Sequence, residues 1–437
     1  MNIGTIITII DLLLWLIIAA NVAYVLFFAL ASLLPKKSLH PSCVPSVASE
    51  QSSSAPINFQ LSPFNSPLEL CSLATEGTQE FSSFLILFPA YHEDAVILHS
   101  VESFLQQDYP KDSYHVVVIS DHMTPETNEQ LSKLPITLLL PTFEHSSKAK
   151  ALQFAINKVE SGKWKVERYD YVVILDADNV VNPSFLSDLS HIVRPNEAIQ
   201  CHRTAKNAEN DIAALDGISE EINNSIFRKG HNRIGMSSAL IGSGMCFDYQ
   251  WFAENVNHLD SAVEDRELEA LLMKQGVHIH YAENIHVLDE KVSNSDTFQR
   301  QRLRWMTGQV QAFVRMLPYI PKAIITGNFN YIDKTIQQAL IPRSILLVLT
   351  PLFAFLSFII PHSSFLIYLW CTLFAVLIAA ILIAIPKQLR TKAIFGKLLT
   401  LPRLVWRMLK NSIYIKYKDT EFHHTPHEDI KHSIPRQ

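Results

Sequence analysis

One short stretch, residues 169–180, constrains this 437-residue chain more than any other. Residues 171–175 are apolar and largely β-branched, which predicts a fully buried strand. The strand ends in Asp176-Ala177-Asp178, and carboxylates at the carboxyl end of a buried strand face the crevice where α/β sheets bind ligands. Two adjacent carboxylates repel each other unless a cation lies beside them. Mg²⁺ is typically bound by one or two protein carboxylates together with phosphate oxygens of the substrate. The stretch therefore predicts a metal–diphosphate site.

Two other interpretations of these residues stay open at this point. A lone D-x-D can simply end a strand before a helix. The run Asp176-Ala177-Asp178-Asn179-Val180 also fits the D-x-D-x-[TV] pattern of haloacid-dehalogenase-type phosphatases, in which the first Asp is a nucleophile. That motif normally opens its domain, whereas here a long α/β segment precedes it, and the paired acidic motif of that family is not found downstream.

Composition narrows the class of protein. The formal net charge of -5 gives no support for a nucleic-acid partner, and none is expected. Hydrophobic residues make up 48% of the chain, and the apolar excess lies at its two ends. The 5 cysteines are scattered and lack the spacing of a zinc site or a disulfide framework, which favours a reducing compartment.

The N-terminal apolar segment predicts a membrane anchor. Residues 12–34 are long enough to span a bilayer, and Asp11 is expected to mark the outer interface. Because Lys36 and Lys37 follow directly, the positive-inside rule places the N-terminus outside and the next domain in the cytoplasm. The Ser- and Pro-rich residues 36–82 then predict a flexible linker.

The C-terminal part predicts two more spans, at residues 344–360 and 364–385, the first short and containing Pro351. Amphipathic patterns at residues 310–317 and 331–341 predict interfacial helices. The chain is thus expected to be a multi-pass integral protein of an inner or plasma membrane with its catalytic domain in the cytoplasm. The predicted parts are an anchor (1–35), a linker (36–82), a catalytic domain (83–310), interfacial helices (311–343), two spans (344–386) and an interfacial helix with a polar tail (387–437).

Strands and helices alternate through the predicted catalytic domain. Strands are expected at residues 84–88, 114–119 and 135–140, and a helix begins near Ser147. This alternation predicts a mostly parallel sheet flanked by helices with right-handed crossovers. Glu93, Asp121 and the D-x-D carboxylates then lie at strand ends along one crevice. Lys148 opens a helix, where its ammonium and free backbone N–H groups suit a phosphate.

Seven short motifs follow one another along the chain. They are Pro89-Ala90-Tyr91-His92-Glu93, Asp121, Lys148-Ala149-Lys150-Ala151-Leu152, Asp176-Ala177-Asp178, Gly242-Ser243-Gly244, Val263-Glu264-Asp265 and Gln301-Arg302-Leu303-Arg304-Trp305. In this order they resemble the motifs of the family-2 glycosyltransferases with a GT-A fold, whose T-E-D motif has Val in place of Thr here. The last motif resembles Q-x-x-R-W, which cellulose, chitin and hyaluronan synthases share with ceramide glucosyltransferases. The resemblance covers roughly residues 84–305 plus the flanking membrane helices.

The resemblance implies an inverting transferase with a nucleotide-sugar donor, expected to be UDP-linked, and a polysaccharide or lipid-linked acceptor at the membrane. Asp178 is expected to hold a divalent metal, Mg²⁺ or Mn²⁺, that neutralises charge on the departing diphosphate. Asp265 is the expected general base. The remaining expected donor residues are Glu93 near the uracil, Asp121 on the nucleoside, Asp176 near ribose or metal, and Lys148, Gln301 and Arg304; the expected acceptor residues are Gly242, Ser243, Gly244 and Trp305.

Some features depart from this pattern or leave it open. His92 stands where the family usually has Asn, and His122 where Asp or Gly is common. Glu264 and Glu267 are interpreted as solvated helix charges. The small number of spans leaves room for a homo-oligomer or accessory export proteins around the chain, and membrane lipid is an expected partner. A membrane-tethered nucleotide-binding regulator without turnover is the alternative from another class.

Overall fold

The computed structural model describes residues 3–36, 81–162, 169–206, 211–261, 263–291, 295–359 and 364–390. The chain divides into one unit made of Met1–Leu34 and Ser82–Gln437, and a second unit, Pro35–Phe81. Almost all of the second unit, which contains the predicted linker, lies outside the described residues. The same holds for most of the predicted interfacial helix and tail at residues 387–437.

One sheet, with eight strands in the described residues, forms the centre of the first unit. The strands are β1 (Phe84–Tyr91), β2 (Tyr114–Asp121), β3 (Thr137–Leu139), β4 (Tyr171–Ile174), β5 (Val180–Val181), β6 (Glu197–Ala205), β7 (Met245–Asp248) and β8 (His278–Asp289). They lie in the order β3-β2-β1-β4-β7-β6-β8-β5. Pairing is parallel for β1 with β2 and β4, for β2 with β3, and for β6 with β8. The antiparallel β7 joins the two parallel groups, so the predicted mostly parallel α/β sheet is confirmed.

Helices connect the strands and cover both faces of the sheet. They are α1 (Ile3–Ala31), α2 (Ile97–Phe104), α3 (Pro125–Ser132), α4 (Lys148–Glu160), α5 (Phe185–Ser190), α6 (Asp211–Asn223), α7 (His231–Arg233), α8 (Tyr249–Asn255), α9 (Glu264–Gln275), α10 (Ser295–Met316), α11 (Ile320–Ile325), α12 (Phe329–Ala339), α13 (Arg343–Ile359) and α14 (Ser364–Ala384). A π-helical turn, Asn224–Gly230, continues α6 into α7.

Burial on both faces explains the continuous apolar runs in the sequence. Val172 and Ile174 of β4 pack into one buried cluster with residues of α4, α8 and α9. Tyr171 and Val173 pack into a second cluster with residues of α2 and α5. Since successive side chains of a strand point to opposite faces, a strand covered on both faces is apolar at every position.

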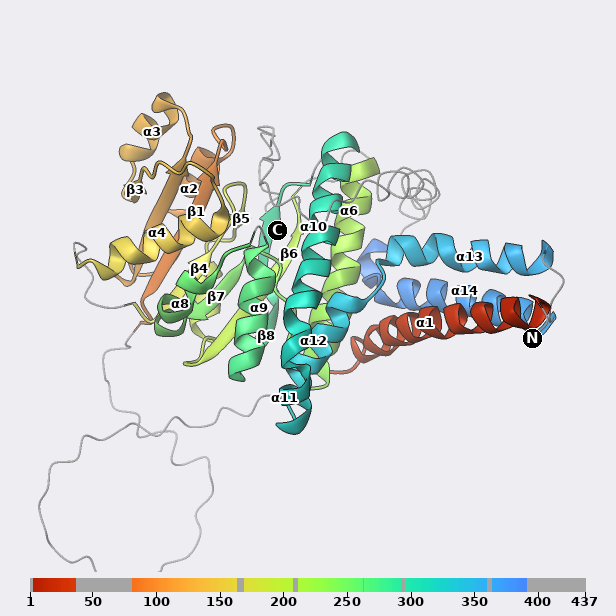
Figure 1. Ribbon diagram of the computed structural model, residues 1–437. Coiled ribbons are helices and arrows are strands. Elements are labelled where there is room, and N and C mark those ends of the chain that lie inside the picture. The colour runs from red at the N-terminus through yellow and green to blue at the C-terminus, as the bar shows by residue number, and fades with distance from the viewer. Residues whose placement is uncertain are drawn as a thin grey trace, which may run out of the picture. The chain divides into compact units, whose positions relative to one another are not determined.

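Two helices in the described residues are long and apolar enough to cross a membrane, Gly4–Ala31 of α1 and Phe365–Ala384 of α14. The predicted span at residues 344–360 corresponds to α13, which is 17 residues long. It follows α12 after a bend of 59°, and only the two together would make a third span. α1, α13 and α14 run side by side (Figure 1).

The first apolar helix differs from its predicted limits. α1 begins at Ile3 and ends at Ala31, earlier at both ends than the predicted span at residues 12–34, and Asp11 lies within the helix. Trp370 Nε1 of α14 donates a hydrogen bond to Asp11 Oδ1 at 3.0 Å. The Asp11 carboxylate thus has a polar partner on the neighbouring apolar helix. The predicted interfacial helix at residues 310–317 is also not separate, because it forms the end of α10 and the turn that follows.

Candidate active site

A cavity of about 540 Å³ lies at the carboxyl ends of β1, β2 and β4. Glu93, Asp121, Asp176 and Asp178 line it, as does Lys148 at the first position of α4. The register of the sheet explains this convergence, because β1 pairs in parallel with β2 and with β4 and the three strands end at the same edge. Ligands of open α/β sheets bind at this edge.

Asp176, Asp178 and Asp289 form a group of carboxylates on this cavity. One oxygen of each lies within 4.8 Å of the other two. Asp178 is 3% exposed, and its Oδ2 accepts a hydrogen bond from the backbone N–H of Glu290 at 2.7 Å. Asn179 Nδ2 donates to Asp178 Oδ1 at 3.1 Å and to Asp289 Oδ1 at 3.3 Å. Converging carboxylate oxygens are the donor set that hard divalent cations prefer, so these residues fit Mg²⁺ or Mn²⁺.

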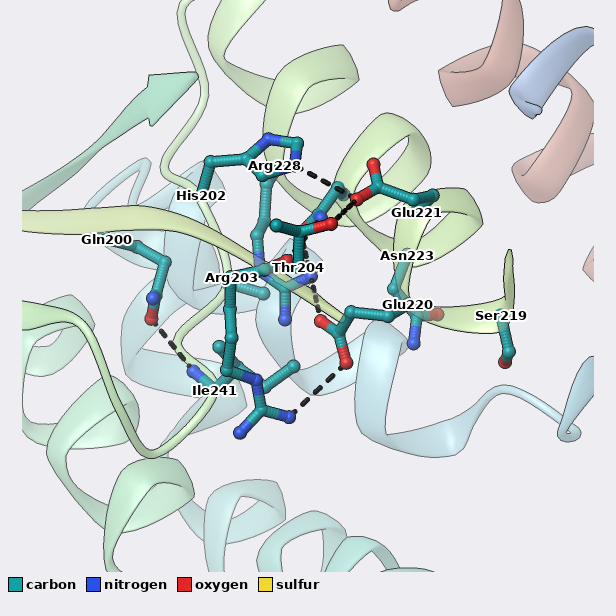
Figure 2. A network of polar contacts seen from close by, with 12 residues as sticks. Gln200, His202, Arg203, Thr204, Ser219, Glu220, Glu221, Asn223, Arg228 and Ile241 are labelled. Carbon is teal, nitrogen blue, oxygen red and sulfur yellow. Dashed lines mark hydrogen bonds and ion pairs between the residues drawn. The ribbon is translucent and has the colours of Figure 1, made fainter. Parts of the chain in front are cut away.

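A buried ion-pair network holds Asp289 in this group, and Figure 2 shows its centre, where Glu220 lies beside Arg203 and Arg228. Glu220 of α6 lies 3.3 Å from Arg203, 3.3 Å from Arg228 and 3.7 Å from Lys291. Burial alone would raise the pKa of Glu220, but these three cations lower it to about 2. Lys291 and Arg203 also pair with Asp289, at 2.8 and 3.7 Å. The network therefore fixes the orientation of one carboxylate of the candidate metal site.

Lys148 joins the strand-end carboxylates to the start of α9. Its Nζ pairs with Asp176, donates to the Gly242 carbonyl at 2.6 Å and lies 3.6 Å from Glu264 Oε1. Burial would lower the pKa of Lys148, but Asp176 and Glu264 raise it above its ordinary value. The side chain is therefore a charged ammonium at a helix N-terminus, an arrangement suited to a phosphate.

Glu264 and Asp265 open α9 and face the loop at Gly242. A Cβ built on Gly242 would lie 3.8 Å from Asp265 Oδ2 and 4.0 Å from Glu264 Oε1. Glu264 is buried, and this burial raises its pKa to about 7, while Lys148 acts in the opposite direction. Glu267 accepts two backbone N–H groups at 3.0 Å each. The interpretation of both glutamates as solvated helix charges is wrong, because each is held by the fold.

The loop Gly242-Ser243-Gly244 contributes less to the cavity than expected of acceptor residues. Of its three members, Gly242 lines the cavity, whereas Ser243 is fully buried. Gly242 has a φ of 81° and Gly244 a φ of 63°, both in the left-handed region. A Cβ on Gly244 would lie 2.9 Å from Val287 Cγ2, so the loop needs glycine for a close approach to β8.

α10 packs directly against the start of α9. A Cβ on Gly308 would lie only 2.5 Å from Val263 Cγ1, so the two helices touch at a glycine. This contact brings Arg304 to the cavity wall near Glu264 and Asp265. Burial lowers the pKa of Arg304, and the two carboxylates oppose that shift. Arginine remains charged at such a site and offers a planar fork to phosphate oxygens.

The other side chains of Q-x-x-R-W face the cavity on the side of α6. Gln301 and Trp305 line the wall, and Oε1 of Gln301 is buried without a hydrogen-bond partner in the described residues. Arg302 pairs with Asp216 of α6, and its guanidinium carbon lies 4.9 Å from the centre of the Trp305 ring. The ring of Trp305 is therefore held in place by a cation on one face.

The residues at the ends of β1 and β2 form an aromatic edge beside Asp121. His92 and His122 have φ values of 54° and 56°, in the left-handed region where Asn, Asp and His are enriched. This backbone geometry explains why histidine can replace the residues usual in the resembling family. The rings of Tyr91, His92 and His122 lie 4.5–5.6 Å apart, and His122 Nδ1 bonds to Asp121 Oδ1 at 2.6 Å. Glu93 lines the cavity at the same edge.

Comparison with known families decides between the interpretations of this site. Residues 85–250 match the profile of "Glycosyl transferase family 2", and residues 171–384 match that of "Glycosyl transferase family group 2". The chain belongs to glycosyltransferase family 2. The phosphatase interpretation of Asp176-Ala177-Asp178 is therefore wrong, since both matches include the motif as part of a glycosyltransferase.

Solved structures show more distant similarities to this family-2 glycosyltransferase. The mannosyltransferase PcManGT from Pyrobaculum calidifontis, in complex with GDP-Man and Mn²⁺, is 15% identical, with 77% of this chain and 89% of that chain covered and a TM-score of 0.46. Glucosyl-3-phosphoglycerate synthase from Mycobacterium tuberculosis, in complex with Mn²⁺, UDP and phosphoglyceric acid, is 14% identical. That match covers 53% of this chain and 78% of that chain, with a TM-score of 0.37.

Sequence reasoning missed several residues of the glycosyltransferase site. Asp289 is the clearest case, because it is the last residue of the strand β8, and β4 is likewise followed by carboxylates. A search for a second apolar strand with a carboxylate at its carboxyl end would have identified Asp289. Glu220 and Arg343 carried no comparable signal, since each lies on a helix without a motif and reaches the cavity only through tertiary packing.

Proposed function

We propose that this glycosyltransferase transfers a sugar, with inversion, from a nucleoside-diphosphate sugar to an acceptor presented at a membrane. The observation that carries the proposal is the group Asp176, Asp178 and Asp289 on one cavity with Lys148. Carboxylates that hold a divalent cation beside an ammonium are suited to a diphosphate leaving group. We take the donor to be UDP-linked, as the motif pattern implies.

The donor would lie along the strand ends. Glu93 and Asp121 would hold the nucleoside, with the aromatic edge of Tyr91, His92 and His122 beside it. Lys148 and Arg304 would bind the diphosphate oxygens. Asp178, with Asp176 and Asp289, would hold Mg²⁺ or Mn²⁺, which when bound neutralises negative charge on the leaving group. Gln301 would complete the donor contacts from α10.

Asp265 is the proposed general base. The acceptor hydroxyl oxygen attacks the anomeric carbon while the bond from that carbon to the diphosphate oxygen breaks. The hydroxyl proton passes to Asp265, and the nucleoside diphosphate leaves with the bonding electron pair. Because attack and departure occur on opposite faces of the carbon, the anomeric configuration is inverted. Trp305 and Gly242 would position the acceptor at this point.

The membrane helices support an acceptor that is lipid-borne or a growing polysaccharide. We propose a cytoplasmic catalytic domain anchored by α1 and α14 in an inner or plasma membrane. A secreted polymer would have to be shielded from lipid across about 30 Å of hydrocarbon. With two or three candidate spans in the described residues, one chain is poorly equipped to enclose such a path. We therefore favour the addition of one or a few sugars to a lipid-borne acceptor.

Calorimetry on the full-length protein in detergent tests this function. Titration with UDP in the presence and absence of Mn²⁺ should show metal-dependent binding, and Asp178→Asn should abolish that dependence because it removes a charged ligand. Asp188→Asn, on the exposed surface of α5, is the matched control and should bind as the parent protein does. Unchanged UDP–Mn²⁺ affinity in Asp178→Asn would refute the site. Binding without hydrolysis or transfer from any of a panel of nucleotide sugars would instead favour the regulator.

A further inference from the structure

The cavity extends from the strand ends to the apolar helices. There its lining includes Val25 of α1, Ile222 of α6, Leu347 of α13 and Ile381 of α14. α6 shares a buried apolar cluster with α1 and α14, so this wall is continuous with the candidate membrane spans. Apolar walls of this kind favour hydrocarbon over water or sugar. We call these four residues the apolar end of the cavity.

Arg343 stands at the border of this apolar end. Its Nη2 donates to Asn223 Oδ1 at 2.7 Å and to the Ser219 carbonyl at 3.2 Å, both on α6. Its Nη1 is buried without a hydrogen-bond partner, and Arg343 forms no ion pair with any residue that the structure describes. A buried charge without a counter-ion is costly unless a ligand supplies one.

The neighbouring cations differ from Arg343 in that each has a carboxylate partner. Arg302 pairs with Asp216, and Arg203, Arg228 and Lys291 pair with Glu220. Figure 2 shows Ser219 and Asn223, which bind Arg343, beside Glu220 on the same helix. Asp216 and Glu220 of α6 are thus already paired with other cations, and Arg343, which lines the cavity, has no ion pair among the described residues.

The backbone adds positive charge at the same point. Pro342 caps α13, and its carbonyl accepts from the N–H groups of Ile345 and Leu346 at 2.8 and 3.1 Å. Pro342, Arg343 and Ser344 all line the cavity, so the N-terminus of this helix lies on its wall. Helix N-termini carry partial positive charge and exposed donors that suit an anion, phosphate above all.

The order of groups along α6 gives the orientation of a ligand. Asp216 holds Arg302 beside Trp305, and Ser219 and Asn223, one and two turns further, hold Arg343. Residues spaced by three, four or seven positions lie on one helix face, so these contacts follow one line. The line leads from the proposed sugar-transfer site, past Arg343, to the apolar end of the cavity.

We propose that Arg343 and the N-terminus of α13 bind the phosphodiester of a lipid acceptor. Its acyl chains would lie along the apolar end, and a hydroxyl of its head group would reach Asp265. The phosphodiester of such a ligand lies between its acyl chains and the hydroxyl that attacks the donor sugar. A phospholipid with a hydroxylated head group has this order of groups. This inference rests on the proposed function, which it narrows from lipid-borne acceptors in general to anionic ones.

Lipid retention by the detergent-solubilised full-length protein tests the proposal. The probes are radiolabelled phosphatidylglycerol and a diacylglycerol with the same acyl chains, which keeps a hydroxyl but lacks the phosphate. Unlabelled glycerol phosphate competes as the free source of the same anion. Arg343→Gln should weaken phosphatidylglycerol binding roughly 10- to 100-fold, as expected for lost charge-assisted hydrogen bonds, and leave diacylglycerol binding unchanged. Arg343→Lys, which keeps the charge, should retain part of the preference.

Arg315→Gln is the matched control, because Arg315 is half exposed and pairs with Asp260 and Glu267 away from this cavity. Equal retention of both lipids by the parent protein, or unchanged preference in Arg343→Gln, would overturn the proposal. If glycerol phosphate competes as strongly as unlabelled phosphatidylglycerol, the claim that the ligand of Arg343 is a lipid is overturned. UDP–Mn²⁺ calorimetry on the same samples separates the outcomes, since a parent protein that binds no nucleotide contradicts the proposed function and not the lipid site. If Arg343→Gln also loses nucleotide binding, the Arg343→Lys variant replaces it in the test. A lysine variant that binds nucleotide and still prefers phosphatidylglycerol supports the proposal, and one that binds nucleotide without that preference overturns it.

Discussion

The two ends of the cavity are built in different ways. At the donor end, Asp121 is the last residue of β2, Asp176 follows β4, and Lys148 opens the helix that lies between them in the sequence. At the apolar end, Val25 and Ile381 come from helices at opposite ends of the sequence. Sheet register alone brings the donor residues together, whereas the apolar end depends on which helix faces meet. The donor end can therefore be read from local patterns, and the apolar end cannot.

α9 and α10 lie where the two ends meet. Glu264 contacts Lys148 of the donor end, and Trp305 is held by Arg302, which is bound to α6. Asp265 lies beside Gly242. If the two ends serve donor and acceptor separately, changes at this junction should affect transfer and leave nucleotide binding intact.

The largest effect is expected for Asp265→Asn. The amide has the same shape but cannot accept the proton, and general-base catalysis contributes about 10²–10⁴-fold in rate. We expect kcat to decrease by a factor within that range, while the affinity for UDP with Mn²⁺ stays at the parent value. Initial rates with the best donor of a panel, together with calorimetry, measure both quantities. Turnover within a few-fold of the parent would remove Asp265 from the role of base.

The contrast between the two ends also explains what the sequence could predict. The buried strands, the parallel sheet and the strand-end residues Asp121, Asp176 and Asp178 follow from local apolar runs and the way they end. Asp289 was missed although β8 ends in the same way, because no motif drew attention to it. The burial of Glu264 and the placement of Arg343 on the cavity wall arise from contacts between distant helices, which no local pattern encodes.

An intermediate effect is expected for Gly308→Ala. The new Cβ would lie 2.5 Å from Val263 Cγ1, so α9 and α10 must move apart. Overpacking of this kind costs about 1–3 kcal/mol and would displace Asp265 from Arg304. We expect a lower Tm and a reduced kcat, with UDP–Mn²⁺ binding less affected than transfer.

Gly4→Ala is the control for Gly308→Ala, since a Cβ at Gly4 would meet nothing within 4 Å. It should leave Tm and kcat unchanged or raise Tm slightly, because alanine is the better helix former. A Gly308→Ala protein with parent Tm and kcat would show that the contact between α9 and α10 does not position the junction.

The smallest effect is expected for Glu264→Gln, observed as a change in the pH dependence of stability. Burial raises the pKa of Glu264 to about 7 in the folded protein, against an ordinary value of 4.5, so the folded state binds this proton more tightly than the unfolded state. Its contribution to stability is then complete below pH 4.5 and is lost as the pH rises toward 7, with a slope of up to about 1.4 kcal/mol per pH unit. Glutamine does not titrate, so the variant should lose less stability between pH 5 and pH 8. Lys148 keeps Asp176 as its partner in that variant. Thermal unfolding without metal or nucleotide checks this, with the exposed Glu254→Gln as control. An identical Tm difference between the two pH values in Glu264→Gln and the parent would mean that Glu264 does not hold a proton at the junction of the two ends.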